Sequence, residues 1–216
     1  MKLATTTSAF FVSILFLNSC TSDSEIELFN GENLDNWSVY ISDDTPADSV
    51  FWVADGVINV SGIPNAYIRS NEEFENFKLH VEWRWLGEAV NSGVLLYVTG
   101  EDMIWPNCIE AQLMSGKAGD FVLIGKGVGI TVKDSVNLIT SKENRYAVLP
   151  KFLESTENEP GEWNEYDITV DQGMIKLKVN GTVQNKGVYV TKTKGNIALQ
   201  SEGGPMQFRN ITLLAL

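Results

Sequence analysis

The sequence predicts an all-β fold, arranged as a sandwich of two sheets, with a barrel as the other closure that such strands can form. Short extended runs recur along the chain, turn dipeptides separate them, and no stretch has an apolar helical period longer than two turns. Only residues 72–76 suggest a short helix. The extended runs are residues 67–69, 77–86, 93–98, 109–113, 166–170, 175–179, 197–199 and 208–213.

Turn dipeptides mark where these runs reverse direction. They occur at Asp55-Gly56, Gln172-Gly173, Asn180-Gly181 and Gly203-Gly204-Pro205. Glycine and asparagine are favoured there because tight hairpin turns need residues that tolerate a positive φ. The second and third dipeptides bracket residues 174–179, so we predict a meander of three antiparallel strands in this region.

The first residues have the features of an export signal. Lys2 gives a positive start, and the apolar run 9–17 is too short to span a bilayer as a mature helix. The segment Leu17-Asn18-Ser19-Cys20 resembles a bacterial lipobox, in which the cysteine is lipidated and becomes the new N-terminus. An ordinary signal peptide with a coincidental cysteine is the alternative. We expect a signal peptide over 1–19, an acylated tether over 20–25 and one domain over 26–216.

A lipidated Cys20 would carry a diacylglycerol and an N-acyl chain, which together hold a protein stably on a membrane. We therefore expect an exported lipoprotein of the outer membrane, with its domain on the periplasmic or the cell-surface side. The chain carries 28 acidic and 16 basic residues, a net charge of −12. Because this charge repels phosphate backbones and anionic headgroups, we expect no nucleic-acid partner and no membrane contact except the anchor.

Several common kinds of site have no support in the sequence. The second cysteine, Cys108, has no partner if Cys20 is lipidated, and one histidine cannot make a dedicated zinc site. The glycine-rich segment 116–129 contains Lys126 but lacks the phosphate-loop pattern, so we predict a surface loop near the site. No cofactor is predicted, and a divalent metal held by oxygen ligands stays open.

The most informative run is 78–85, where polar and apolar residues alternate. Side chains of a strand alternate between its two faces, so one face is apolar and the other is charged. The apolar face holds Leu79, Val81, Trp83 and Trp85. The polar face holds His80, Glu82 and Arg84.

Two further runs repeat this alternation. Glu110 and Gln112 share one face of their run, and Gln200 and Glu202 share one face of theirs. If all three strands belong to one sheet, their polar faces form a single patch of carboxylates, amides and an arginine. Such groups suit sugar hydroxyls and proton transfer. The alternative is an ordinary solvent-facing side of a sheet. Among the tryptophans, Trp105 is the best candidate for an exposed ring that stacks on a sugar.

Segments spread over the chain, in order, resemble the 3-keto-disaccharide hydrolase family. The resemblance opens with Leu28-Phe29-Asn30-Gly31-Glu32-Asn33-Leu34 and Trp37 and covers about residues 26–216. Further matching segments are 52–56, 77–84, Asn91-Ser92-Gly93-Val94, Glu110 with Gln112, Gly161-Glu162-Trp163-Asn164, Val179-Asn180-Gly181 and 195–213.

The resemblance implies a concanavalin A-like jelly roll of two antiparallel sheets and action on glycosides oxidised to a ketone at C3 of the sugar. Many relatives carry Asp-His where this chain has Ser201-Glu202. This chain then either lacks the function of that histidine or uses Glu202 in its place.

The expected chemistry is removal of the C2 proton and elimination of the anomeric oxygen, followed by hydration. We expect Glu110 to act as the base, Arg84 to stabilise the enolate, and Glu82 or Glu202 to supply the second carboxyl group. The remaining expected substrate contacts are Gln112, Gln200, His80, Trp105 and Lys126, although a lone histidine such as His80 is also common as a satisfied sheet residue.

Two other functions fit the same residues. A conventional glycosidase would use two carboxylates on an unoxidised glycan. A non-catalytic lipoprotein that binds an oligosaccharide or glycoside would need only the polar patch and the tryptophans. The sequence leaves the oligomeric state open.

Overall fold

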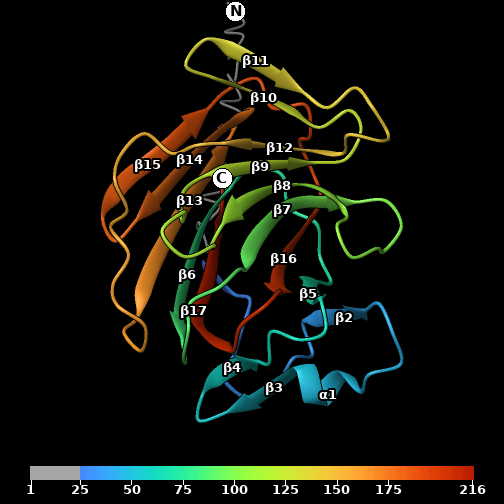
Figure 1. The fold of residues 1–216 in the computed structure, drawn as a ribbon, viewed down its shortest axis with the longest axis vertical. Coiled ribbons are helices and arrows are strands. Elements are labelled where there is room, and N and C mark those ends of the chain that lie inside the picture. Colours follow the sequence, from blue (N-terminus) through green and yellow to red (C-terminus); the bar gives the residue numbers. More distant parts are fainter. Residues whose placement is uncertain (1–24) are drawn as a thin grey trace, which may run out of the picture.

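The computed structural model describes residues 25–216 and has an all-β architecture with one short helix, α1 (Ala47–Val50) (Figure 1). Most strands form two large antiparallel sheets that pack face to face, so the predicted two-sheet jelly-roll sandwich is confirmed. Within residues 25–216, no helix is long and apolar enough to cross a membrane. The predicted signal peptide, Cys20 and most of the tether lie outside the described residues.

One large sheet, called the front sheet below, has the strand order β12-β9-β8-β7-β16-β5-β2, which can be followed from top to bottom in Figure 1. Its strands are β12 (Tyr146–Leu149), β9 (Phe121–Ile124), β8 (Asn107–Gln112), β7 (Gly93–Thr99), β16 (Asn196–Ser201), β5 (Ala66–Ser70) and β2 (Trp37–Ile41).

The other large sheet, called the back sheet below, has the order β15-β14-β13-β6-β17-β4-β3, with β1 paired to β17. Its strands are β15 (Thr182–Gly187), β14 (Met174–Val179), β13 (Asn164–Asp171), β6 (Phe77–Trp85), β17 (Met206–Ala215), β4 (Val57–Val60), β3 (Phe51–Ala54) and β1 (Glu25–Glu27). A separate hairpin consists of β10 (Gly129–Val132) and β11 (Ser135–Leu138).

All eight predicted extended runs are strands, and the predicted meander is confirmed as β13-β14-β15. The short helix expected at 72–76 is wrong, because Phe74 instead makes an isolated bridge to Gly195. The surface loop expected over 116–129 is also wrong in part. The segment contains β9, whose side chains are all buried, and the surrounding glycines masked this short apolar run.

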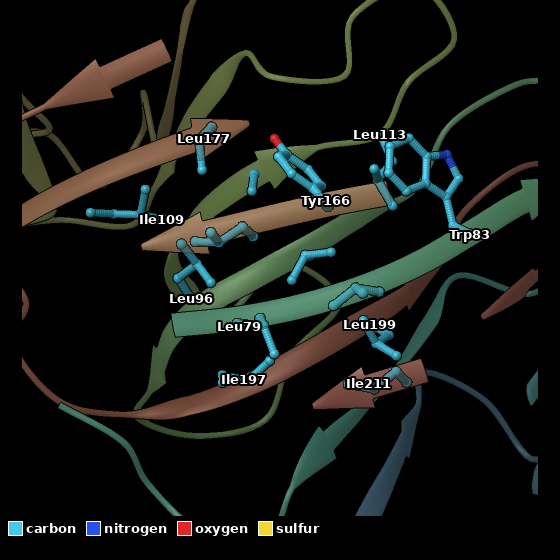
Figure 2. Close-up of a cluster of buried hydrophobic side chains, with 14 of the residues drawn as sticks. Leu79, Trp83, Leu96, Ile109, Leu113, Tyr166, Leu177, Ile197, Leu199 and Ile211 are labelled. Carbon is cyan, nitrogen blue, oxygen red and sulfur yellow. The ribbon is translucent and has the colours of Figure 1, made fainter. Parts of the chain in front are cut away.

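Alternate residues of both sheets fill the space between them. Figure 2 shows these side chains meeting in one layer, with Leu79 and Trp83 from β6 facing Leu96 from β7 and Ile109 from β8. The Trp83 ring lies 5.6 Å from the ring of Tyr166. The alternation predicted for β6 is therefore confirmed, because its apolar face is in this core. The polar residues of β6 alternate with this apolar face and therefore point outward, away from the partner sheet.

A second apolar cluster lies on the outward face of the front sheet. It consists of Tyr67, Leu95, Val98, Cys108, Val122, Ile124 and Ala198. The segment between β7 and β8, residues 100–106, is held by contacts on both sides. On one side, Asp102 accepts a hydrogen bond of 2.6 Å from Tyr67 and pairs with Arg69 at 3.4 Å. On the other side, Arg145 donates to the carbonyl oxygen of Trp105 at 3.2 Å. We call residues 100–106 the front loop.

The sandwich begins at Glu25, which the sequence analysis assigned to the tether. Glu25 lies opposite Leu214 in the β1–β17 pair, and its carboxylate accepts a hydrogen bond of 2.7 Å from Thr212. The first described residue is thus already fixed to the last strand of the back sheet.

Candidate active site

The outward face of the front sheet and the adjoining front loop bring together five of the predicted site residues. Glu110 and Gln112 point outward from β8, whereas Ile109 and Ala111 of the same strand lie in the core. Gln200 and Glu202 come from β16 and the residue after it, on the same side. We call this group the front-face site; it also includes Asn91, Gly93 and Trp105.

Glu110 is a buried carboxyl group, with 4 % of its surface exposed. Burial disfavours the charged form of the group, and the nearby carboxylate of Glu202 adds to this effect. Together they raise the pKa of Glu110 to about 8 from its ordinary value of 4.5. Glu110 therefore holds a proton at neutral pH, a property expected of a group that exchanges protons with a ligand.

Gly93 of β7 provides the space that Glu110 occupies. A Cβ atom on Gly93 would lie 2.3 Å from Oε1 of Glu110 and 2.6 Å from Oε1 of Gln200, closer than any real contact. Every other residue type would therefore push one of these side chains away. Sequence reasoning did not select Gly93 or Asn91 as site residues, although both belong to the segment Asn91-Ser92-Gly93-Val94 that carried part of the family resemblance. A glycine inside a strand is the available signal of a close approach.

Three buried oxygen atoms of the site have no hydrogen-bond partner among the described residues. They are Oδ1 of Asn91, Oε1 of Glu110 and Oε1 of Gln200. Buried polar atoms are almost always paired, and an unpaired one costs about 1–3 kcal/mol. The amide oxygens of Asn91 and Gln200 are acceptors, so the site is suited to a ligand that brings hydrogen-bond donors, such as a polyhydroxylated molecule.

Glu202 is less deeply buried than Glu110 and has better-placed donors. Hydrogen bonds from Asn91 and Trp105 favour the carboxylate, but burial outweighs them, so the pKa of Glu202 is raised. Asn91 is also held beside it by an isolated backbone bridge. The Trp105 side chain is 48 % exposed, so the expectation of an exposed ring at this position is confirmed.

Gln112 presents an amide of fixed orientation. Its Oε1 accepts hydrogen bonds from the backbone N–H groups of Leu113 at 2.8 Å and Met114 at 2.7 Å. Because the oxygen is occupied, the Nε2 group is the part of this amide left to donate to a ligand.

The structure does not bring His80, Glu82 and Arg84 to this site. These three residues lie on β6, between β13 and β17 of the back sheet, and point away from the core. The expectation that β6, β8 and β16 share a sheet is wrong. The alternation along β6 correctly separated its core face from its outward face, but the outward faces of the two sheets lie on opposite sides of the sandwich.

On the back sheet these residues belong to a network of paired groups. Glu82 accepts hydrogen bonds of 2.6 Å from both Arg209 and Asn210. The guanidinium groups of Arg84 and Arg209 both lie over the ring of Trp163, at 4.6 Å and 3.9 Å. Burial alone would raise the pKa of Glu82, but these hydrogen bonds and the charge of Arg209 outweigh it, so the pKa is lowered.

His80 and Lys126 also lie apart from the front-face site. The ring of His80 contacts Asp167 at 2.8 Å on the outward face of the back sheet, and Asp167 pairs with Lys178 at 3.0 Å. Lys126 is exposed in the turn after β9, four residues beyond Val122, the residue opposite Glu110. Neither position supports the substrate contact expected from the sequence. Among residues 25–216, no group of three histidine, cysteine or acidic side chains could hold a metal ion.

Comparison with solved structures places this fold among carbohydrate-active proteins. Two crystal structures from Parabacteroides distasonis, assigned as glycosyl hydrolases, match with TM-scores of 0.64 and 0.63. Their sequence identities are 21% and 25%, over 89% of this chain and 94% and 100% of theirs. A Bacillus licheniformis β-glucanase matches with a TM-score of 0.57 and 10% identity, over 88% of this chain and 96% of its own.

The comparison with curated proteins found no match. The model of one protein family, described as the 3-keto-alpha-glucoside-1,2-lyase-like domain, matches residues 24–214. This match covers nearly the whole chain and agrees with the resemblance noted in the sequence and with the fold. The chain therefore belongs to the 3-keto-alpha-glucoside-1,2-lyase-like domain family.

Proposed function

We propose that the protein cleaves glycosides that carry a ketone at C3 of the sugar, by elimination between C1 and C2. The observation that carries the proposal is the pair Glu110 and Glu202, two carboxyl groups on one sheet face whose pKa values are both raised, that of Glu110 by more. Pairs of titratable groups with separated pKa values are typical of acid and base partners. Family membership supports the substrate class and the type of reaction.

The chemistry needs one base and one acid. The ketone acidifies the hydrogen on C2, so a base removes this proton and the electron pair is delocalised onto the C3 oxygen as an enolate. The enolate then forms the C1–C2 double bond and breaks the bond between C1 and the glycosidic oxygen. The acid protonates that oxygen as it leaves. Addition of water to the unsaturated sugar would complete a net hydrolysis.

In this proposal Glu110 is the acid and Glu202 is the base. Glu110 was expected from the sequence as the base, but a carboxyl group with a pKa of about 8 carries a proton at neutral pH and is ready to donate it. Burial also raises the pKa of Glu202, but by less, and the hydrogen bonds from Asn91 and Trp105 favour its charged form, so Glu202 is the better base of the two. General acid–base catalysis by each residue would contribute roughly 10²–10⁴-fold.

The front-face site offers a replacement for Arg84, which lies on the other side of the molecule. The Nε2 group of Gln112 is positioned by two backbone contacts and would donate to the enolate oxygen. A single preorganised donor of this kind contributes about 3–4 kcal/mol to a transition state. The unpaired oxygens of Asn91 and Gln200 would accept sugar hydroxyls, and Trp105 would stack on a ring.

The test is incubation of the purified protein with 3-keto-disaccharides and with their unoxidised parents, followed by mass spectrometry of the products. We expect cleavage of the keto forms alone. Glu110→Gln and Glu202→Gln should each reduce turnover by at least about 10²-fold. Glu82→Gln, the same change on the opposite face, should leave turnover unchanged.

Two outcomes would contradict the proposal. Equal cleavage of the unoxidised parents would indicate a conventional two-carboxylate glycosidase. Saturable binding without any product would indicate a carbohydrate-binding module.

We also propose that the protein is an exported lipoprotein, anchored through Cys20, whose only contact with the membrane is the anchor. Its expected partner is an oligosaccharide or glycoside, and no cofactor is part of the proposal.

A further inference from the structure

We propose that Gln200 and Gly93 hold Glu110 in its neutral form, with the Glu110 carboxyl group donating its proton from Oε1 to Oε1 of Gln200. Gln200 and Gly93 are thus positioning residues that keep the Glu110 carboxyl group protonated before a ligand binds. The protonation state rests only on the geometry of this site, whereas the catalytic use of the proton rests on the proposed function.

The first argument is the arrangement of the two oxygen atoms. Oε1 of Glu110 and Oε1 of Gln200 lie 2.3 Å and 2.6 Å from one point, the place where a Cβ atom of Gly93 would be. Both are buried, and neither has a partner among the described residues. Both oxygens therefore border the same small space beside Gly93. Two oxygens in such a space satisfy one another only if one of them carries a proton. Of the two groups, only the carboxyl group can do so.

The second argument is the presence of glycine at position 93. Gly93 lies at the start of β7 and does not have the positive φ that would require a glycine. Its backbone would therefore accept alanine, and glycine in a strand is otherwise unfavourable. What excludes a side chain here is the Glu110 carboxyl group and the Gln200 amide. The glycine thus preserves the contact between these two groups.

The third argument is the charge around Glu110. The titratable groups that act on it or feel its charge are Glu202 at the end of β16, Cys108 on its own strand and Tyr166 on β13 of the back sheet. None of them is a cation. The charge of Arg145 acts on the neighbouring Cys108, where it opposes the rise in the pKa of the thiol. Burial and the carboxylate of Glu202 both favour the neutral form, which agrees with the raised pKa of Glu110.

The alternative arrangement has the Gln200 amide turned by 180°, so that Nε2 donates to an ionised Glu110. The two arrangements predict opposite effects when the amide is removed. If Gln200 accepts the proton, Gln200→Leu removes a partner of the neutral form and lowers the pKa of Glu110. If Gln200 donates to the carboxylate, the same change removes a partner of the charged form and raises that pKa.

The experiment is a pH titration of the protein labelled with ¹³C at its glutamate carboxyl groups, followed by NMR without substrate. Glu110→Gln identifies the Glu110 signal, because that signal disappears in the variant. We expect a midpoint near pH 8, and Gln200→Leu should lower it by about one pH unit, the equivalent of one hydrogen bond. A rise of the midpoint in Gln200→Leu would overturn the proposal. So would ionisation of Glu110 at pH 7 on addition of Ca²⁺, because a cation would then be the natural partner of these oxygens.

The second measurement uses a matched pair of glycines. Gly93→Ala should displace the carboxyl group and lower the midpoint of Glu110, whereas Gly87→Ala, which meets no atom within 4 Å, should leave it unchanged. Circular dichroism would establish that both variants are folded, and an unchanged midpoint in folded Gly93→Ala would overturn the role of Gly93. If Gly93→Ala does not fold, the sign of the Gln200→Leu shift decides alone. Because no substrate is used, the expected titration together with inertness toward 3-keto-disaccharides would overturn only the proposed function.

Discussion

A single buried carboxyl group determines much of the behaviour of the front face. Glu110 lies opposite the apolar residues Leu95 and Val122 of the adjacent strands, and no basic group is among the causes of its raised pKa. A protein interior accepts a carboxyl group in this setting only in its neutral form or with a partner that stabilises the charge. Ionising Glu110 therefore costs more free energy in the folded protein than in the unfolded chain, and this difference makes the stability depend on pH.

We predict that the protein loses stability as the pH rises from about 4.5 to about 8. Below pH 4.5 Glu110 is neutral in the folded and the unfolded chain, so it has no effect. Between these values the unfolded chain loses the proton while the folded protein keeps it, so the free energy of unfolding falls as the pH rises. The total decrease is on the order of a few kcal/mol.

The measurement is chemical denaturation at several pH values, with Glu110→Gln as the control. The variant cannot ionise at this position, so the part of the pH dependence that Glu110 causes should be absent from it. Identical pH profiles of the two proteins would contradict the raised pKa. The lowered pKa values of Glu82 and Asp167 act at acidic pH, where their stabilising charges are lost as the pH falls, so they do not obscure this window.

At the scale of single strands, β6 shows what the sequence can and cannot predict. Its alternation identified the core face and the outward face, because the direction of a side chain depends only on its place in the strand. The choice of sheet depends on hydrogen bonds to β13 and β17, which come from distant parts of the chain. No pattern within residues 77–85 contains that information, so Glu82 and Arg84 were assigned to the wrong surface.

The other strands follow the same rule. β13, β14 and β15 were predictable as a meander because both of their turns are local signals, Gln172-Gly173 and Asn180-Gly181. β9 was not predicted, since four apolar residues between glycines resemble a loop as much as a strand. Within the site, Glu110 and Glu202 were found by alternation. The part played by Gly93 depends on a contact among three strands, which no single segment reveals.

The relocation of Glu82 leads to a prediction for the back sheet. Glu82→Gln removes a carboxylate whose side chain is 14% exposed and which pairs with Arg209 and Asn210. We expect the free energy of unfolding at pH 7 to fall by about 1–3 kcal/mol, because the hydrogen-bonded charge is lost. Thermal and chemical denaturation would measure this change. Its size should shrink as the pH falls and wild-type Glu82 becomes protonated, and an undiminished difference at low pH would contradict the lowered pKa.

At the scale of the whole molecule, the sandwich presents two chemically different outward faces. The front face holds buried acceptors that lack partners, whereas the acidic and basic groups of the back face are paired with one another. Within residues 25–216, the front face is therefore the outward face whose site oxygens can gain partners from a ligand. Glu25 is joined to β17 of the back sheet, so a tether that precedes it would leave the molecule from that sheet.

The proposed anchor is tested by the location of the protein in the cell. We predict that the wild-type protein fractionates with membranes, because several acyl chains on Cys20 give stable attachment. Cys20→Ser should lose the lipid and appear in the soluble fraction, while Cys108→Ser, which changes a buried cysteine of the domain, should stay with the membranes. Recovery of Cys20→Ser in the membrane fraction would contradict the lipoprotein assignment.

The front loop combines contacts that stabilise the fold with a residue of the candidate site, so changes in sugar specificity would also affect stability. The same seven residues attach to Tyr67 and Arg69 on one side, receive Arg145 on the other, and direct Trp105 toward Glu202. A change that reshapes this segment for a new sugar would thus also weaken its contacts with Tyr67, Arg69 and Arg145. Selection for a new specificity would have to be accompanied by stabilising changes elsewhere, a trade-off common where an active site and a structural contact share residues. The back sheet, far from the reacting groups, is where such compensating substitutions could accumulate without altering specificity.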